Sequence, residues 1–206
     1  MATETSRTAK IDVTGVILAG GQASRLGGVD KGLLPVAGKP LIEHVLAALA
    51  PQVARVLISA NRNLDHYAGY GWPVLPDAPG GYAGPLAGVL SALRAARGGY
   101  ILTVPCDCPL LPSDLSARLR EKIAQRNVCV AHDGTRMQPL FALLSCALAE
   151  DLQRYLDGGG RKVETWITGQ RPALADFANQ PESFLNINTA RERDIVERRM
   201  MDSIHV

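Results

Sequence analysis

Residues 16–35 read VILAGGQASRLGGVDKGLLP, and this stretch decides the fold. It opens with an apolar run that is too short for a helix and is typical of a strand buried on both faces. Glycine pairs follow at 20–21 and 27–28, with Arg25 between them and Lys31 after them. A strand that ends in a glycine-rich loop presents backbone N–H groups to a phosphate, because no side chain keeps the phosphate away. Since Arg25 and Lys31 add positive charge, the stretch predicts a nucleotide-binding loop.

The spacing of this loop differs from two other phosphate-binding motifs. GxxxxGK[ST] requires Ser or Thr after the Lys, whereas Gly32 follows Lys31, and the dinucleotide fingerprint GxGxxG is absent from the loop. The longer string GG-x-x-S-R-L-GG-x-x-K is more specific. It resembles the signature loop of the nucleotidyltransferases, which move a nucleoside monophosphate from a nucleoside triphosphate to an acceptor phosphate.

Apolar runs and helical periodicity alternate along the rest of the chain. Strands are predicted at residues 12–19, 55–59, 72–75, 100–104, 128–131, 140–144, 174–177 and 184–188. Helices are predicted at 41–49, 64–70, 85–93 and 147–156, after Ser113 as an N-cap, and after Thr189. This alternation predicts an α/β fold with three αβα layers and a Rossmann-like, mostly parallel sheet. The strands at 128–131 and 140–144, joined by the turn 132–134, are expected to form a small antiparallel insertion beside the cleft.

Composition and charge exclude several classes of protein. The chain has 206 residues and a net charge of +2, which is too small to indicate nucleic acid or membrane as the main partner. No apolar run approaches the ~18 residues of a membrane span, and the polar start has no apolar core of a secretory signal. We therefore expect one nucleotidyltransferase domain over residues 1–206, loose at 1–9 and 201–206, in the cytoplasm. The cysteines and the scattered histidines complete no metal-ligand or nucleophile pattern, so reduced thiols are expected.

Asp107 directly follows the predicted strand at residues 100–104 and lies between two prolines. In a parallel sheet the carboxyl ends of strands share one edge, so Asp107 is expected to lie across from the glycine-rich loop. A triphosphate carries more negative charge than Arg25 and Lys31 neutralise, and Mg²⁺ takes one or two carboxylates together with phosphate oxygens. Asp107 is the first candidate for that carboxylate. Asp77 is the second, and a contact to a nucleobase or ribose is equally open to it.

Further segments extend the pattern begun by residues 16–35. They are SANRN at 59–63, YAGPLAGVLSAL at 82–93, VPCDCPLLP at 104–112, HDGTRMQPLFALL at 132–144 and FLNINT at 184–189. Together they resemble the molybdenum cofactor guanylyltransferases, which build molybdopterin guanine dinucleotide, over nearly all of residues 14–195. The segments GGVDKGLL and PCDCP are the most specific parts of the resemblance.

The resemblance implies a role for each matched residue. Arg25, Lys31 and Asp107 would be catalytic, and Asp107 would bind Mg²⁺. Asn186 and Asn188 would face the pterin, although ordinary polar alternation on a half-exposed strand explains them equally well. The implied GTP-binding residues are Leu18, Ala19, Gly20, Gly21, Arg25, Lys31, Ser59, Asn61, Asp77, Gly84, Gly88 and Asp107. Family members can carry N-x-N-R where this chain has Ser59-Ala60-Asn61-Arg62, so either the Ser59 backbone or Asn61 would take over the base-side contact.

The implied reaction is transfer of GMP from GTP to the terminal phosphate of molybdopterin, with release of pyrophosphate. Molybdoenzymes or their chaperones are further expected partners, for delivery of the cofactor. The same chemistry with CTP, or with a sugar phosphate as acceptor, is the nearest alternative. An alternative of another class is a non-catalytic GTP-binding docking protein, which would need neither Lys31 nor Asp107 for a leaving group or metal.

Overall fold

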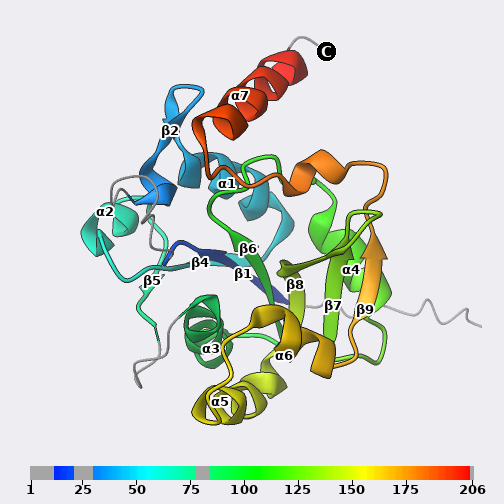
Figure 1. The fold of residues 1–206 in the computed structure, drawn as a ribbon. Helices are drawn as coiled ribbons and strands as arrows, with labels where there is room; N and C mark the ends of the chain where they lie inside the picture. The colour runs from blue at the N-terminus through cyan, green and yellow to red at the C-terminus, as the bar shows by residue number, and fades with distance from the viewer. Residues whose placement is uncertain (1–11, 21–29, 78–83, 205–206) are drawn as a thin grey trace, which may run out of the picture.

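A seven-stranded sheet runs through the middle of the protein (Figure 1). The computed structural model describes residues 12–20, 30–77 and 84–204. The sheet has the order β5-β4-β1-β6-β8-β7-β9. Its strands are β1 (Val13–Leu18), β4 (Arg55–Ser59), β5 (Val74–Leu75), β6 (Tyr100–Pro105), β7 (Val128–His132), β8 (Met137–Ser145) and β9 (Ala173–Asp176). Every pairing is parallel except the two made by β8, which confirms the predicted mostly parallel sheet.

Helices cover both faces of this sheet. They are α1 (Leu41–Leu49), α2 (Leu64–Ala68), α3 (Pro85–Ala95), α4 (Leu115–Ile123), α5 (Ala149–Asp157), α6 (Val163–Gly169) and α7 (Ala190–Ile204). The helices α1 and α4 lie on one face, and α3, α5 and α6 lie on the other (Figure 1). The predicted three-layer αβα arrangement is therefore confirmed. None of the helices in the described ranges has the length and apolar character needed to cross a membrane.

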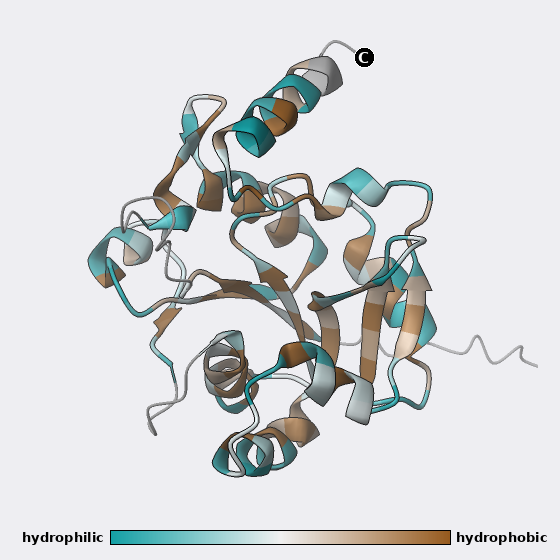
Figure 2. Cartoon of the chain, viewed as in Figure 1, coloured by the Kyte–Doolittle hydropathy of each residue, from teal (hydrophilic) through white to brown (hydrophobic). Residues whose placement is uncertain are grey.

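The alternation of side chains along the strands divides the core in two. In β1, Val13 and Ile17 pack with α1 and α4, whereas Val16 and Leu18 pack with α3. Both faces of the strand are thus apolar, as the brown central strands in Figure 2 show. Gly15 allows the close approach of α1, because a Cβ there would lie 3.0 Å from the Leu49 side chain.

A small hairpin that the sequence analysis missed precedes α1. The strands β2 (Pro35–Val36) and β3 (Lys39–Pro40) pair antiparallel around a two-residue turn. Ala37 and Gly38 both have positive φ, at 47° and 79°, which is the conformation of a type I′ hairpin turn. In Figure 1 α7 lies beside this hairpin, to its right, and the Ala37 N–H donates to the Glu197 carboxylate at 3.0 Å.

Two predicted features are wrong. Residues 184–188 do not form a strand: a 3₁₀ turn at Pro181–Phe184 leads into irregular backbone, in which the Ile187 N–H donates to the Asp107 carbonyl at 2.9 Å. Ser113 is not the N-cap of α4, because the Leu115 N–H bonds the Pro112 carbonyl and places Ser113 inside a turn. Other boundaries shift slightly: the helix predicted at 147–156 starts as a 3₁₀ turn at Cys146–Leu148. The helix α6 was not predicted.

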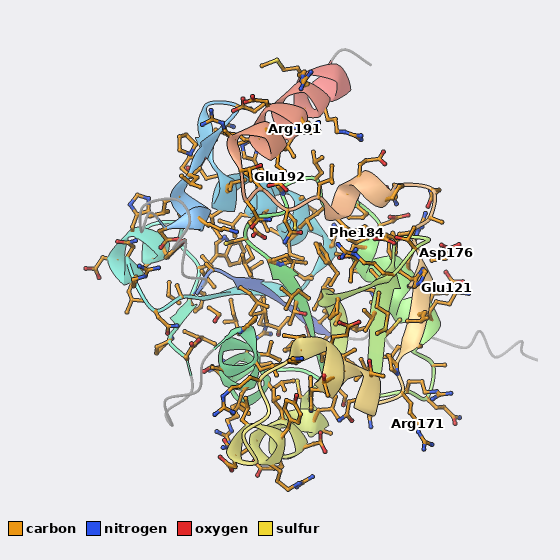
Figure 3. All side chains as sticks on the ribbon, in the orientation of Figure 1. Glu121, Arg171, Asp176, Phe184, Arg191 and Glu192 are labelled. Atoms are coloured by element: carbon orange, nitrogen blue, oxygen red, sulfur yellow. The ribbon has the colours of Figure 1, made fainter. Side chains whose placement is uncertain are left out.

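The predicted capping of α7 by Thr189 is confirmed. Its Oγ1 accepts from the Glu192 N–H at 3.2 Å, and the Glu192 carboxylate accepts from the Asn188 N–H at 2.7 Å, which forms a capping box. This hydrogen bond from Asn188 is the main reason that the pKa of Glu192 is lowered. Figure 3 shows Glu192 at the start of α7 and Arg191 on the same turn. The cap fixes the backbone at Asn188, which is one of the predicted site residues.

Candidate active site

A cleft of about 640 Å³ lies at the carboxyl edge of the sheet, where β1, β4 and β6 end and α3 begins. This is the place where ligands bind in open α/β sheets. Most of the predicted site residues line it, although they are far apart in the sequence: Leu18, Gly20, Lys31, Ser59, Asn61, Asp77, Gly84, Gly88, Asp107 and Asn186. Gly21 and Arg25 lie outside the described residues.

Lys31 and Asp107 form the charged centre of the cleft. The Lys31 ammonium lies 3.0 Å from Asp107 Oδ2, and the two side chains are 19% and 12% exposed. The ammonium also donates to the Asn188 Oδ1. A lysine that is paired but still open to solvent can exchange its protein partner for a phosphate oxygen. The predicted proximity of these two residues is present in the structure.

Asn186 joins this centre through a thiol. The Cys108 Sγ–H donates to Asn186 Oδ1 at 3.0 Å, which turns the Asn186 amide nitrogen toward Asp107 Oδ1 at 3.5 Å. Burial raises the pKa of the Cys106 and Cys108 thiols, and the neighbouring Asp107 charge raises both further. Both thiols therefore stay protonated at neutral pH and are poor nucleophiles. Cys108 acts as a hydrogen-bond donor to Asn186.

A second polar pair lies on the other side of the cleft, after β4 and β5. The Asn61 amide donates to Asp77 Oδ2 at 2.7 Å, and the Asp77 N–H donates back to Asn61 Oδ1 at 2.9 Å. Burial raises the pKa of the Asp77 carboxyl, and the Asn61 hydrogen bond opposes part of that rise. The Asp77 carboxylate and the Asn61 amide are thus held in one orientation before any ligand arrives.

Glycines leave the space beside this pair open. A Cβ on Gly88 would lie 2.2 Å from Ser59 Oγ and 3.3 Å from Asp77 Oδ1, so no larger side chain fits there. Gly84 has a φ of 94°, which favours glycine, and Pro85 then starts α3. Both glycines predicted from the sequence therefore have a physical reason at this edge.

Ala19 was predicted to belong to the GTP-binding loop, and the structure shows that it does not line the cleft. It is 4% exposed, and its N–H donates to the Ser59 carbonyl at 2.8 Å. That hydrogen bond extends the pairing of β1 and β4 by one residue. The Ala19 N–H is therefore engaged with the protein, and Gly20 is the first loop residue that faces the cleft.

The residues present fit a magnesium ion shared with a phosphate. No group of three or more His, Cys, Asp or Glu side chains within residues 12–20, 30–77 and 84–204 could enclose a metal. Mg²⁺ does not require such a group, since it takes one or two carboxylates, phosphate oxygens and water. Asp107 supplies one carboxylate whose Oδ1 has only long contacts, at 3.5 Å to Asn186 and 3.7 Å to Cys108. That oxygen is available to a cation in the cleft.

Sequence reasoning missed four residues of the cleft lining: Pro85, Pro105, Cys106 and Leu140. Pro85 and Cys106 adjoin predicted residues and Pro105 is two residues from Asp107, so these predicted residues were the available signal. Leu140 comes from β8, whose predicted place in an antiparallel insertion beside the cleft is confirmed, although the sequence analysis named no site residue on that strand.

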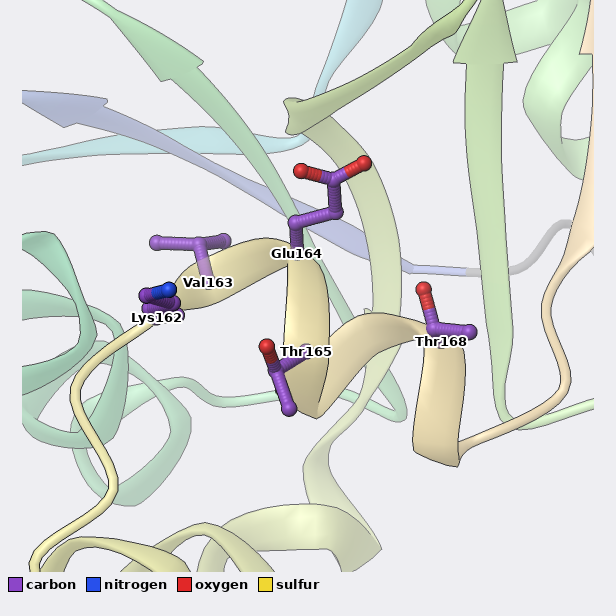
Figure 4. Close-up of a pocket in the computed structure, with 5 residues that line it drawn as sticks. All are labelled: Lys162, Val163, Glu164, Thr165 and Thr168. Atoms are coloured by element: carbon purple, nitrogen blue, oxygen red, sulfur yellow. The ribbon is translucent and has the colours of Figure 1, made fainter.

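Another hollow, of about 580 Å³, lies along α6 and is shown in Figure 4. Its lining consists of Lys162, Val163, Glu164, Thr165 and Thr168, all from α6 and the residue before it. None of these is a predicted site residue. The hollow is therefore separate from the Lys31–Asp107 centre.

The cleft combines the carboxyl edge of a parallel sheet, the Lys31–Asp107 pair and the Asn61–Asp77 pair. These features define a nucleotide-handling α/β enzyme. The family model described as the MobA-like NTP transferase domain matches residues 15–172, so the chain is a nucleotidyltransferase. The molybdenum cofactor guanylyltransferase of Shewanella sediminis is 43% identical over 185 residues, which cover 89% of this chain and 94% of that protein. The one of Ralstonia nicotianae is 46% identical over 200 residues, which cover 91% and 98%. The chain belongs to the molybdenum cofactor guanylyltransferase family, as its sequence resemblance implied.

Solved structures with low sequence identity share the fold. Molybdopterin-guanine dinucleotide biosynthesis protein A from Archaeoglobus fulgidus aligns with a TM-score of 0.76 at 22% identity, over 92% of this chain and 99% of that one. The 2-C-methyl-D-erythritol 4-phosphate cytidylyltransferase from Thermus thermophilus aligns with a TM-score of 0.68 at 20% identity, over 90% and 98%. The chain thus shares its fold with a protein named as a cytidylyltransferase, so the fold alone does not determine which nucleotide is used.

Proposed function

We propose that this enzyme transfers GMP from GTP to the terminal phosphate of molybdopterin, which releases pyrophosphate and forms molybdopterin guanine dinucleotide. The single observation that carries the proposal is the Lys31–Asp107 pair, 3.0 Å apart in the cleft, within a chain 43% identical to a molybdenum cofactor guanylyltransferase. The described residues would act as one nucleotidyltransferase domain, because the same cleft is lined by residues as far apart in the sequence as Leu18 and Asn186.

The reaction requires alignment and charge neutralisation more than proton transfer. An oxygen of the molybdopterin phosphate attacks the α-phosphorus of GTP, and the bond from that phosphorus to the bridging oxygen of pyrophosphate breaks. A phosphate monoester is largely ionised near neutral pH, so no side chain has to remove a proton from it. In our proposal Lys31 leaves Asp107 to bind the triphosphate and neutralises the charge that develops on the departing pyrophosphate. Arg25 and the loop N–H groups would add to this stabilisation.

Asp107 would hold Mg²⁺, with Asn186 and Asn188 beside it on the pterin side. The ion, when bound, would neutralise phosphate charge and act as a template for the phosphate oxygens. Asn188 would keep Lys31 in the cleft after the lysine has left Asp107. The Cys108 thiol would keep the Asn186 amide nitrogen directed toward the reacting phosphates.

Asn61 and Asp77 would face the base. Guanine presents N–H donors at N1 and N2 and an acceptor at O6, whereas cytosine presents one amino donor at N4 followed by two acceptors, N3 and O2. With Asp77 Oδ2 bound to the Asn61 amide, Asp77 Oδ1 offers an acceptor to the guanine donors and suits cytosine less well. Gly88 and Ser59 would form the floor of this base-binding region. The acceptor that Asp77 offers favours GTP over the CTP alternative.

Pyrophosphate release tests the proposal. The enzyme is supplied with molybdopterin, Mg²⁺ and either GTP, CTP or ATP, and both pyrophosphate and the dinucleotide product are measured. We expect release with GTP in a one-to-one ratio to the product. Faster release with CTP would identify a cytidylyltransferase, and release with a sugar phosphate alone would identify another acceptor. GTP binding without release would favour the docking protein. Delivery of the product to molybdoenzymes or their chaperones remains part of the proposal.

A further inference from the structure

Asp30, the residue before Lys31, lies in a hydrogen-bonded network behind the cleft. Asp30 is 9% exposed, and its carboxylate accepts three hydrogen bonds. Oδ1 accepts from the Tyr67 hydroxyl at 2.6 Å and from the Gly32 N–H at 3.2 Å, while Oδ2 accepts from the Asn63 amide at 3.0 Å. Every one of these donors is neutral. The Lys31 ammonium, although next in sequence, points away from Asp30 to Asp107.

These contacts fix the backbone on which Lys31 stands. Asp30 is the N-cap of the 3₁₀ turn Lys31–Leu33, and its side chain binds the orphan N–H of Gly32. Tyr67 is completely buried, and burial raises the pKa of its hydroxyl, with a further rise from Asp30. The hydroxyl therefore remains a proton donor to Asp30 at all ordinary pH values. One end of the turn is anchored in the protein while the lysine side chain reaches into the cleft.

The packing at Gly32 explains why the motif has Gly after Lys31. A Cβ on Gly32 would lie 2.5 Å from the Tyr67 hydroxyl, which is closer than real contacts allow. Glycine at this position is therefore required by the Tyr67–Asp30 hydrogen bond. The sequence GGVDKGLL encodes the carboxylate, the lysine and the space for the tyrosine in three successive residues.

Asn63 connects the network to the base side of the cleft. It has a φ of 51°, a left-handed conformation that asparagine and aspartate tolerate better than most residues. It lies two residues after Asn61, which pairs with Asp77 at the base side. The carboxylate of Asp30 thus joins the turn that carries Lys31 to the turn that follows β4.

We propose that Asp30 is a positioning residue for Lys31, held in place by Tyr67 and Asn63, and that this network sets the affinity of the cleft for a triphosphate. The inference rests on the proposed function to the extent that Lys31 binds the nucleotide phosphates. Asp30 itself touches no substrate and acts through the lysine. Its effect should therefore be seen with phosphates and be absent with a nucleoside.

A reciprocal exchange of two side chains tests this positioning role. In Asp30→Asn an amide nitrogen replaces Oδ2 and faces the Asn63 amide nitrogen, while Oδ1 keeps Tyr67 and Gly32. In the double variant Asp30→Asn/Asn63→Asp the new amide donates to the new carboxylate, and all three hydrogen bonds return. Binding of GTP with Mg²⁺ and of guanosine is measured by titration for the whole chain. Lys31→Ala calibrates the loss of the lysine, and Asp65→Asn, on the exposed side of α2, is the matched control.

We expect Asp30→Asn to weaken GTP binding about tenfold, in line with the loss of a hydrogen bond to a buried charge, and to leave guanosine binding within about twofold. The double variant should recover to within about threefold of the wild type, and Tyr67→Phe should resemble Asp30→Asn. Equal losses for GTP and guanosine, or a double variant no better than Asp30→Asn, would overturn the inference, as would an unchanged affinity in Lys31→Ala. If the wild type binds GTP through Lys31 but releases no pyrophosphate, the proposed function fails, and the binding series still decides the role of Asp30.

Discussion

Replacing Asp107 by Asn separates a metal-binding role from a role in folding. The change removes the charge of Asp107 and keeps its size and one oxygen that can accept from Lys31. The Lys31 ammonium, which lies 3.0 Å from the carboxylate oxygen, then donates to a neutral amide oxygen instead. Lys31 also keeps Asn188 as a partner. Since Lys31 keeps an acceptor and loses only the ion-pair contribution, which is about 1 kcal/mol or less for a pair still open to solvent, the free energy of unfolding should fall by at most about 1 kcal/mol. The fold should therefore survive.

The expected loss of turnover is far larger than the loss of stability. Charge-neutralising groups in phosphoryl transfer contribute about 10³-fold in rate or more, which corresponds to about 4 kcal/mol of the barrier. Binding of GTP without Mg²⁺ should be unchanged or tighter in Asp107→Asn, because a carboxylate that repels the triphosphate is gone and Lys31 is released. Turnover should thus fall steeply while GTP binding without Mg²⁺ does not weaken.

The assay compares wild type, Asp107→Asn and Asp114→Asn. Asp114 is a suitable control because it forms an ion pair with Arg118 at 2.8 Å and does not line the cleft. Pyrophosphate release is followed over a titration with Mg²⁺, and GTP binding is measured with and without the ion. Near-normal turnover of Asp107→Asn at saturating Mg²⁺ would refute the metal assignment. Equal losses in Asp107→Asn and Asp114→Asn would show that stability is the cause.

Three further changes probe the other groups of the cleft. Cys108→Ala removes the hydrogen bond to Asn186 and should lower turnover about tenfold, whereas Cys108→Ser keeps a donor and should stay within about threefold of wild type; equal rates for the two would contradict the thiol's role. Gly88→Ala places a methyl group 2.2 Å from Ser59 Oγ, so GTP affinity should fall by at least about tenfold while the structure of the rest of the chain is kept; unchanged affinity would show that the base lies elsewhere. Because the pKa of Asp77 is raised, the folded state holds the carboxyl proton more tightly than the unfolded state, and the free energy of unfolding should decline as pH rises through that pKa. Urea unfolding of Asp77→Asn between pH 4 and 7 should lack this decline.

The strands that form the site could be predicted because each is a buried apolar run followed by polar residues. The ends of β1, β4 and β6 lie at one edge, as expected for parallel strands, and this brings Lys31 and Asp107 together from 76 positions apart. Gly84 and Gly88, in contrast, were implied by the family resemblance. For Lys31 and Asp107 the local pattern and the general rule for open sheets were sufficient.

The remaining features depend on tertiary contacts that no local pattern shows. The segment 184–188 alternates like a strand, yet it lies outside the sheet, and its Ile187 N–H donates to the Asp107 carbonyl. Leu140 lines the cleft from the predicted insertion, because β8 lies between β6 and β7 in the sheet. Asp30 is next to Lys31 in the sequence, but its partner Tyr67 comes from a helix 37 positions away.

A crystal structure with GTP and Mg²⁺ bound tests the central claim most directly. The triphosphate should lie between Gly20 and Lys31 on one side and the Mg²⁺-bearing carboxylate of Asp107 on the other, with the guanine against Asn61 and Asp77. Lys31 should have moved from Asp107 to a phosphate oxygen. A nucleotide bound outside this cleft, or one whose phosphates lie away from Lys31 and Asp107, would contradict the account.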